Sequence, residues 1–231
     1  MHRDSSRGGN PAKTPAMPFI SFEGLDGSGK STLIKNLKAH LEGAGLKVVV
    51  TREPGGTPLA EDIRGLILRT GHEAPVAATE ILLYEASRAQ HVAKVIQPAL
   101  REGRWVLCDR FSESTVAFQC FARGVNRPEV EWLNRFAEQG TRPEAVVLLD
   151  LSVEASRQRQ GGREAQAGQS RDRIENEADE FHNRVRNGFL AQAKAEPERW
   201  IVLDAGLSQE ALLQALLSVL QKRFAQEGFP G

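Results

Sequence analysis

The chain has 231 residues, of which 40% are hydrophobic and 26% are charged, so it can bury a sizeable core and we expect one large domain. Thirty basic residues balance thirty acidic ones, and this neutral total argues against a general surface for nucleic acid or anionic membranes. No run approaches the roughly 20 apolar residues of a membrane span, and no signal-peptide core is present. Cys108 and Cys120 are too few and too isolated for a disulfide framework or a zinc site. We therefore expect a cytoplasmic protein.

From the N-terminus, a disordered tail is predicted over residues 1–16, because they hold little that could be buried, and a single domain over residues 17–227. Short apolar runs predict strands at Pro18–Phe22, Val48–Thr51, Trp105–Asp109, Ala145–Asp150 and Trp200–Asp204. Amphipathic spacing predicts helices at Thr32–Leu41, Leu59–Arg69, Ala78–Arg101, Arg127–Gln139, Ser152–Gln160, Glu175–Lys194 and Gln209–Ala225. The alternation predicts an α/β fold, in which a five-stranded parallel sheet is wrapped by helices and binds its ligand at the carboxyl ends of the strands.

A glycine-rich motif lies between the first predicted strand and the first predicted helix. Residues 24–32 match the phosphate-loop pattern G-x-x-x-x-G-K-[ST]. Glycines at 27 and 29 let the backbone turn its N–H groups toward phosphate, and the helix dipole favours the same negative charge. Lys30 would reach the outer phosphates and Ser31 would offer a hydroxyl to Mg²⁺. The residues predicted to bind ATP are Gly24, Leu25, Asp26, Gly27, Ser28, Gly29, Lys30, Ser31 and Thr32.

Charged side chains follow the next two predicted strands. Arg52 comes directly after the second strand, and Asp109 and Arg110 end the third. In a nucleotide kinase Asp109 would help to hold Mg²⁺ and Arg110 would bind the acceptor phosphate. The alternative is an exposed strand end with a surface ion pair.

The segment from Gly161 to Glu175 is polar, contains glycine and is rich in arginine. It predicts a mobile lid over about residues 160–174, which would exclude water and bring a guanidinium group to the transferring phosphoryl group. The alternative is a solvated charged loop, which is what most such segments are.

Five separated motifs occur in a fixed order, namely Phe22–Thr32, Thr51–Thr57, Leu82–His91, Cys108–Thr115 and Asp172–Glu175. Together they resemble the bacterial-type thymidylate kinases, which use ATP and Mg²⁺ to phosphorylate dTMP to dTDP in the synthesis of dTTP. The resemblance runs from about Pro18 to the C-terminal helix. It implies a P-loop nucleoside monophosphate kinase fold and a homodimer packed through helices, with no nucleic-acid or membrane partner.

The resemblance also implies a dTMP site. Tyr84 and Arg88 share a helix face; Tyr84 would stack on thymine, where family members more often carry phenylalanine, and Arg88 would bond a base carbonyl. Phe118 would favour deoxyribose and Gln119 would contact the thymine edge, although the common family run is tyrosine-glutamine-glycine. Apart from the family, a lone helical aromatic is more often a core residue. The dTMP-binding residues implied are Asp26, Arg52, Tyr84, Arg88, Arg110, Ser114, Thr115, Phe118 and Gln119.

Gly27 bears on where the catalytic arginine lies. Some family members carry arginine at this loop position, whereas those with glycine supply it from the lid. The resemblance therefore implies a lid arginine, with Arg163 the first candidate and Arg173 the next, although Arg159 and Arg171 also remain open. Asp26 would bond the acceptor sugar and orient Mg²⁺-bound water, or else it bonds only its own turn. The implied catalytic set is Lys30, Asp26, Arg110, Arg163 and Arg173, and the implied Mg²⁺ set is Ser31 and Asp109.

Other functions stay open at this point. The first alternative is a kinase for a different nucleoside or deoxynucleoside monophosphate. A GTP-binding switch would carry an Asn-Lys-x-Asp motif, which the sequence lacks, and a nucleic-acid-binding ATPase would need a basic stripe.

Overall fold

The protein is built on one five-stranded sheet. A computed structural model describes residues 18–71, 73–167 and 172–230, with residues 163–167 described as backbone only. All neighbouring strands run parallel, in the order β2-β3-β1-β4-β5. The strands are β1 (Phe19–Glu23), β2 (Val48–Arg52), β3 (Trp105–Asp109), β4 (Ala145–Asp150) and β5 (Trp200–Asp204). The predicted sheet is confirmed, whereas the predicted tail lies outside the described residues.

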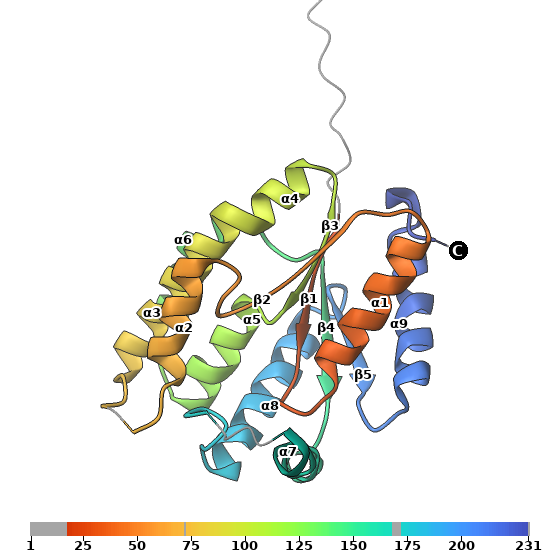
Figure 1. Cartoon of the computed structure of the whole chain (residues 1–231). Coiled ribbons are helices and arrows are strands. Elements are labelled where there is room, and N and C mark those ends of the chain that lie inside the picture. The colour runs from red at the N-terminus through yellow and green to blue at the C-terminus, as the bar shows by residue number, and fades with distance from the viewer. Residues whose placement is uncertain (1–17, 72, 168–171, 231) are drawn as a thin grey trace, which may run out of the picture.

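Helices cover both faces of the sheet (Figure 1). They are α1 (Lys30–Gly43), α2 (Pro58–Leu68), α3 (Ala77–His91), α4 (Gln97–Arg101), α5 (Ser112–Thr115), α6 (Arg127–Glu138), α7 (Val153–Ala167), α8 (Asp179–Ala195) and α9 (Gln209–Arg223). Two π-helical turns, η1 (Val92–Ile96) and η2 (Val116–Ala122), and a 3₁₀ turn, η3 (Ala225–Glu227), complete the order. In Figure 1 α1 and α9 lie together at the right, and α2, α3 and α6 gather at the left.

The two-residue alternation of the strands explains this layering. In β4, Val147 and Leu149 pack into the cluster that includes α1 and α9, whereas Val146 and Leu148 pack into the cluster with α8. Successive strand side chains point to opposite faces, so an apolar run such as Ala145–Asp150 needs helices on both sides. The carboxyl ends of β1, β3 and β4 are thereby left at one edge, where the loops that follow them meet.

Three local predictions differ from the structure. The helix predicted to end at Gln160 continues to Ala167, because good helix formers follow the two glycines. The helix predicted from Glu175 begins only at Asp179, since Asp172 Oδ1 accepts the backbone N–H groups of residues 174 and 175 and holds a turn there. Residues 112–122 are helical although no helix was predicted for them. Across residues 18–71, 73–167 and 172–230, no helix has the length and apolar character of a membrane span.

Candidate active site

The phosphate loop connects β1 to the N-terminus of α1. Gly24 has φ 134°, and a Cβ there would lie 2.5 Å from the carbonyl oxygen of Leu149, so only glycine fits. Gly29 caps α1 in the left-handed conformation, with φ 98°. Lys30 is buried, and its Nζ donates to the carbonyl oxygens of Gly24, at 3.0 Å, and Leu25, at 3.2 Å. The motif therefore adopts the strand, turn and helix arrangement that the sequence predicts.

Ser31 and Asp109 meet beside this loop. Ser31 Oγ donates to Asp109 Oδ2 at 3.2 Å, and both residues line the same cavity. A hydroxyl and a carboxylate are the oxygen ligands that Mg²⁺ prefers, so the pair fits this ion. In the described part of the chain no group of three or more His, Cys, Asp or Glu side chains is placed to hold a metal. Phosphate and water oxygens would therefore have to complete the coordination of an ion at this pair.

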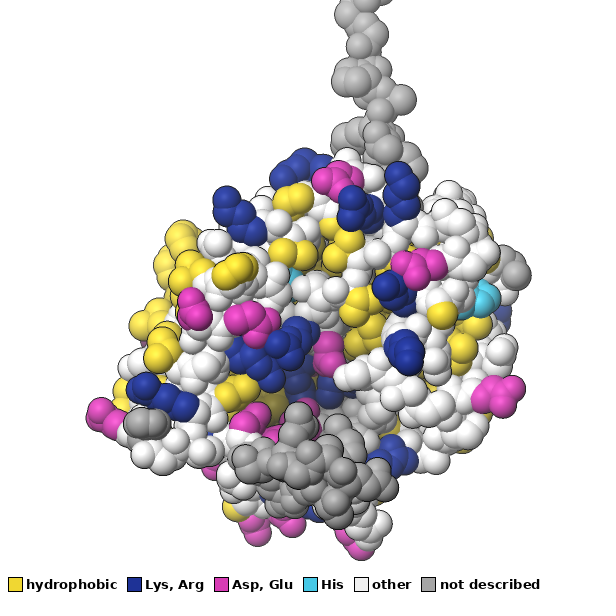
Figure 2. Space-filling view, in the orientation of Figure 1, with side chains coloured by type: hydrophobic (Ala, Val, Ile, Leu, Met, Phe, Trp, Pro, Cys, Tyr) yellow, Lys and Arg dark blue, Asp and Glu magenta, His cyan; other side chains and the backbone are white. Residues whose placement is uncertain are grey.

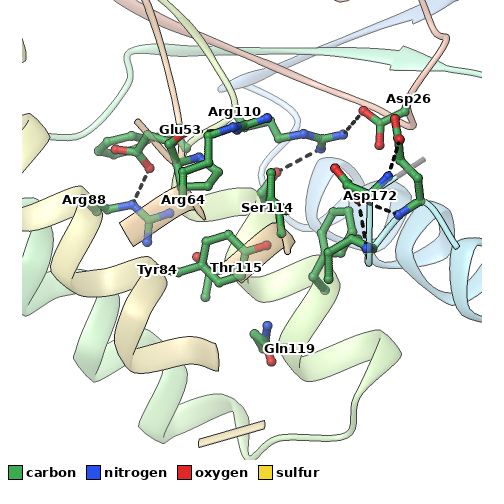
Figure 3. A pocket seen from close by; sticks show the side chains of 16 residues that line it. Asp26, Glu53, Arg64, Tyr84, Arg88, Arg110, Ser114, Thr115, Gln119 and Asp172 are labelled. Carbon is green, nitrogen blue, oxygen red and sulfur yellow. Dashed lines mark hydrogen bonds and ion pairs between the residues drawn. The ribbon is translucent and has the colours of Figure 1, made fainter. Parts of the chain in front are cut away.

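Two adjoining cavities lie at the carboxyl edge of the sheet, and four residues line both of them: Asp26, Glu53, Arg64 and Arg110. We call the two cavities the phosphate cavity and the acceptor cavity. The phosphate cavity is otherwise lined by Gly27, Gly29, Lys30, Ser31, Thr32, Arg52 and Asp109. The acceptor cavity is otherwise lined by Pro54, Leu68, Tyr84, Arg88, Phe111, Ser114, Thr115, Phe118, Gln119, Asp172, Ile174 and Glu175 (Figure 3). Dark-blue basic side chains gather in the hollow at the centre of Figure 2.

Arg110 spans the boundary between the two cavities (Figure 3). Its Nη2 donates to Asp26 Oδ1 at 3.0 Å and its Nη1 donates to Ser114 Oγ at 3.2 Å. Burial alone would raise the pKa of Asp26, but the positive charges of Arg110 and Lys30 outweigh it and lower the pKa well below its usual range. The boundary therefore carries an ionised carboxylate between two cations.

On the acceptor side, Tyr84 and Arg88 lie on one face of α3. Arg88 is 2% exposed, and its Nε donates to Glu53 Oε2 at 2.8 Å. Its Nη1 donates to Glu85 Oε1 at 2.7 Å and to Asn134 Oδ1 at 2.8 Å. Burial raises the pKa of Tyr84, so its phenol stays protonated. Arg88 is thus fixed in place by partners on three sides before any ligand is considered.

Gln119 and Phe118 form another part of the acceptor wall. Gln119 Nε2 donates to Glu80 Oε1 at 2.7 Å, and its buried Oε1 has no hydrogen-bond partner among the described residues. The ring centroid of Phe118 lies 6.0 Å from that of Phe181, and the Arg110 guanidinium lies over the Phe118 ring, 5.4 Å from its centroid. This wall therefore combines an aromatic face with one unused acceptor atom.

Known proteins are similar to this chain in sequence and in fold. The family model for thymidylate kinase matches residues 22–216. The chain belongs to the thymidylate kinase family. A thymidylate kinase from Bdellovibrio bacteriovorus is 53% identical over 90% of this chain and 97% of the relative, and one from Geobacter sulfurreducens is 47% identical over 89% and 97%. The crystal structure of thymidylate kinase from Ehrlichia chaffeensis matches with a TM-score of 0.70 and 32% identity, over 90% of this chain and all of that one. The predicted family and kinase fold are confirmed.

The arginines that the sequence predicts as lid candidates in this thymidylate kinase family member are only partly described. The side chains of Arg163 and Arg171 lie outside the described residues. Arg173 lines neither cavity; its guanidinium donates to Glu80 and, at 2.9 Å, to the carbonyl oxygen of Ile67. Arg159 Nη1 donates to the Gly27 carbonyl at 3.4 Å. Among the predicted candidates whose side chains are described, Arg159 is thus the one that contacts the phosphate loop.

Sequence reasoning missed Arg64, which lines both cavities from α2. Burial, together with the nearby charge of Arg52, lowers its pKa. A signal was present in the sequence, because Arg64 falls at helical spacing between the buried Ala60 and Ile67. A charge within an apolar helix stripe indicates a functional site. Glu53 was missed as well, and it is buried between Arg88 and His91.

Proposed function

We propose that the protein transfers the γ-phosphoryl group of ATP to dTMP, giving dTDP and ADP. The observation that carries this proposal is the pair of adjoining cavities that share Asp26 and Arg110. One cavity is lined by a phosphate loop, so it suits the donor, and the other has an aromatic and amide wall, so it suits a base. Membership of the thymidylate kinase family supports dTMP as the acceptor.

The donor phosphates are proposed to lie on the loop amides and on Lys30, whose Nζ now satisfies two loop carbonyls. Ser31 and Asp109 would hold Mg²⁺, which would supply positive charge to neutralise the donor phosphates. Lys30 keeps a compact positive charge at the inner end of the cavity. These residues bind and orient the donor, so the γ-phosphoryl group faces the shared boundary.

The acceptor is proposed to place its phosphate at that boundary, against Arg110, Arg64 and Arg52. The second phosphate pKa is about 6, so the attacking oxygen is already ionised at neutral pH and no general base is needed. Tyr84 and Phe118 would contact the base and the sugar. Arg88, held by Glu53 and Glu85, would meet a base carbonyl. Positioning and charge neutralisation then account for catalysis.

A lid arginine is proposed to neutralise the transferring group, since Gly27 brings no charge to the loop. Arg163 is the first candidate. Arg173 is a weaker one, because its guanidinium is engaged by Glu80, and Arg159 gains weight from its contact with Gly27. An arginine in this role raises kcat by a factor on the order of 10³ to 10⁵.

We also propose a homodimer. Exposed apolar side chains lie on α3 and on the two helices that contact it, with Leu59 and Leu66 on α2, Leu82 on α3 and the stacked pair Trp132 and Phe136 on α6. Yellow side chains gather along the left of Figure 2, where Figure 1 has α2 and α3. A surface of this kind is typical of a protein interface.

The test is ATP consumption by the purified protein with dTMP, dUMP, dCMP, dGMP and AMP in parallel. We expect a clear preference for dTMP. K30A and R110A should lose most turnover while they keep the wild-type melting profile. A preference for another monophosphate would refute the proposed substrate, and near-wild-type rates in either variant would refute the roles given to these residues.

A further inference from the structure

The backbone of Arg110 is unusual, because this non-glycine residue has φ 72°. A left-handed conformation is unfavourable for a residue with a side chain, so it persists only where the surroundings hold it in place. The Arg110 N–H donates to the Phe22 carbonyl at 2.9 Å, which ties the turn to β1 from one side. Other contacts must fix the chain that follows.

Glu23, the last residue of β1, supplies those contacts. It is fully buried, and its Oε1 accepts the backbone N–H of Phe111 at 2.8 Å. Its Oε2 lies 2.6 Å from Ser114 Oγ and 3.9 Å from Arg110 Nη1. Ser114 Oγ in turn accepts from Arg110 Nη1 at 3.2 Å (Figure 3). One carboxyl group therefore holds both the backbone after Arg110 and the hydroxyl that orients its guanidinium.

We propose that Glu23 is a positioning residue for Arg110, and that through Phe111 and Ser114 it sets the place of the guanidinium between the donor and acceptor phosphates. The consequence for turnover rests on the proposed function. The contacts themselves are hydrogen bonds, so the role needs two correctly placed polar atoms rather than a negative charge.

The surroundings of Glu23 favour a role in hydrogen bonding over a role as a negative charge. The charged groups that interact with it are Arg110, Glu113 and Lys30. Burial raises the pKa of Glu23 to about 8, although Arg110 opposes this shift. Ser114 Oγ donates to the ionised carboxylate, and because a hydroxyl can also accept, a protonated carboxyl can accept from the Phe111 N–H and donate to Ser114 Oγ instead. The amide of glutamine can do the same with its oxygen and its NH₂ group.

The experiment compares E23Q with E23A. E23Q should keep kcat/KM for dTMP within about threefold of the wild type, because it preserves both hydrogen bonds. E23A should lose on the order of 10² in kcat/KM for dTMP, the cost of an ångström-scale misplacement, while KM for ATP changes less than about twofold. If the role of Glu23 were purely structural, E23A would be less stable, but kcat/KM for dTMP would not fall while KM for ATP stays nearly constant.

Hydrogen exchange of the Phe111 and Ser114 amides gives a readout that needs no substrate. We expect exchange at least about tenfold faster in E23A than in E23Q. Should E23A fail to fold, E23D, one methylene shorter, takes its place with an intermediate effect expected. Equal exchange in both variants, or wild-type kinetics in E23A or its substitute, would overturn the proposal. If the wild-type protein were inactive on dTMP, the proposed function would be refuted. The comparison of hydrogen exchange in E23A and E23Q would still decide whether Glu23 positions the backbone after Arg110.

Discussion

Glu23 and Asp26 flank the same arginine but differ in protonation. Asp26 lies 3.0 Å from Arg110 and 3.8 Å from Lys30, and these cations keep it ionised against the effect of burial. Glu23 is more deeply enclosed and its nearest cation, Arg110, is 3.9 Å away, so burial prevails and its pKa rises to about 8. Two carboxyls three positions apart can therefore serve different purposes, one as a charge and the other as a hydrogen-bonding group.

The raised pKa of Glu23 predicts a pH dependence of stability. Its ordinary value is 4.5 and its folded value is about 8, so the folded state favours the protonated form. The stabilisation that the protonated carboxyl gives to the folded state is fully present below pH 4.5 and is lost as the pH rises through 8. Relative to E23Q, the wild type should therefore lose melting temperature between about pH 5 and pH 8.5.

Thermal melts of both proteins across this range measure the effect. Because groups such as Asp26 are common to the two proteins, the difference between them isolates residue 23. A difference that stays constant with pH would show that Glu23 ionises at its ordinary value in the folded protein.

Residues with a local signal were predictable, and residues defined by distant partners were not. The phosphate loop was readable because its geometry depends on glycines within nine consecutive residues. Glu23 lies inside the motif Phe22–Thr32, but its role depends on Phe111 and Ser114, which the fold brings to the end of β1. The spacing of Arg64 on its helix marks it as unusual, but only the packing of α2 shows that it lines both cavities.

At the scale of elements, Glu80 joins three segments that are distant in sequence. This carboxylate of α3 is 1% exposed and accepts hydrogen bonds from Gln119, Arg123 and Arg173. Arg123 also donates to Glu177 at 2.9 Å. The turn that follows α7 is therefore fastened to α3 and η2, and it forms part of the acceptor wall through neighbouring residues such as Ile174.

The variant E80Q should reduce the free energy of unfolding by about 3 kcal/mol, because removing one partner of a buried ion pair leaves uncompensated charge. It should also raise KM for dTMP, since the acceptor wall loses its anchor. Urea denaturation and initial-rate kinetics measure the two effects. The control is E129Q, which alters an exposed glutamate of α6. Equal stability of E80Q and E129Q would contradict the anchoring role.

The elements that could be predicted are those whose own residue pattern shows which side chains are buried. All five strands are apolar runs; β1, β3 and β4 are buried, whereas the edge strands β2 and β5 each keep an exposed valine, and three of the five have the predicted bounds. The helix over residues 112–122 was missed because its apolar and aromatic side chains pack against the sheet and α8, which hides the helical spacing. The start of α8 depends on the Asp172 turn, which is a matter of local hydrogen bonds.

For the whole molecule, the apolar face over α2, α3 and α6 leads to a prediction about assembly. Trp132 and Phe136 are 58% and 71% exposed, with ring centroids 5.8 Å apart. The double variant W132D/F136D should shift the solution mass from dimer to monomer, because buried charge opposes association. Light scattering after size exclusion measures this mass. L207D, a change at an exposed leucine outside this face, serves as the control. A monomeric wild type, or an unchanged mass in the double variant, would exclude this face as the interface.

The place of β1 at the centre of the sheet has a consequence for how the chain reaches its fold during synthesis. This strand leaves the ribosome before any other described strand, yet its partners are Val106 in β3 and Ala145 in β4. Phe19, Ile20 and Phe22 must therefore wait, unpaired, until much of the chain has emerged. The same strand ends in Glu23 and the phosphate loop. The nucleotide site therefore cannot form around a partly made protein, and nascent chains would need protection from aggregation before they could bind substrate.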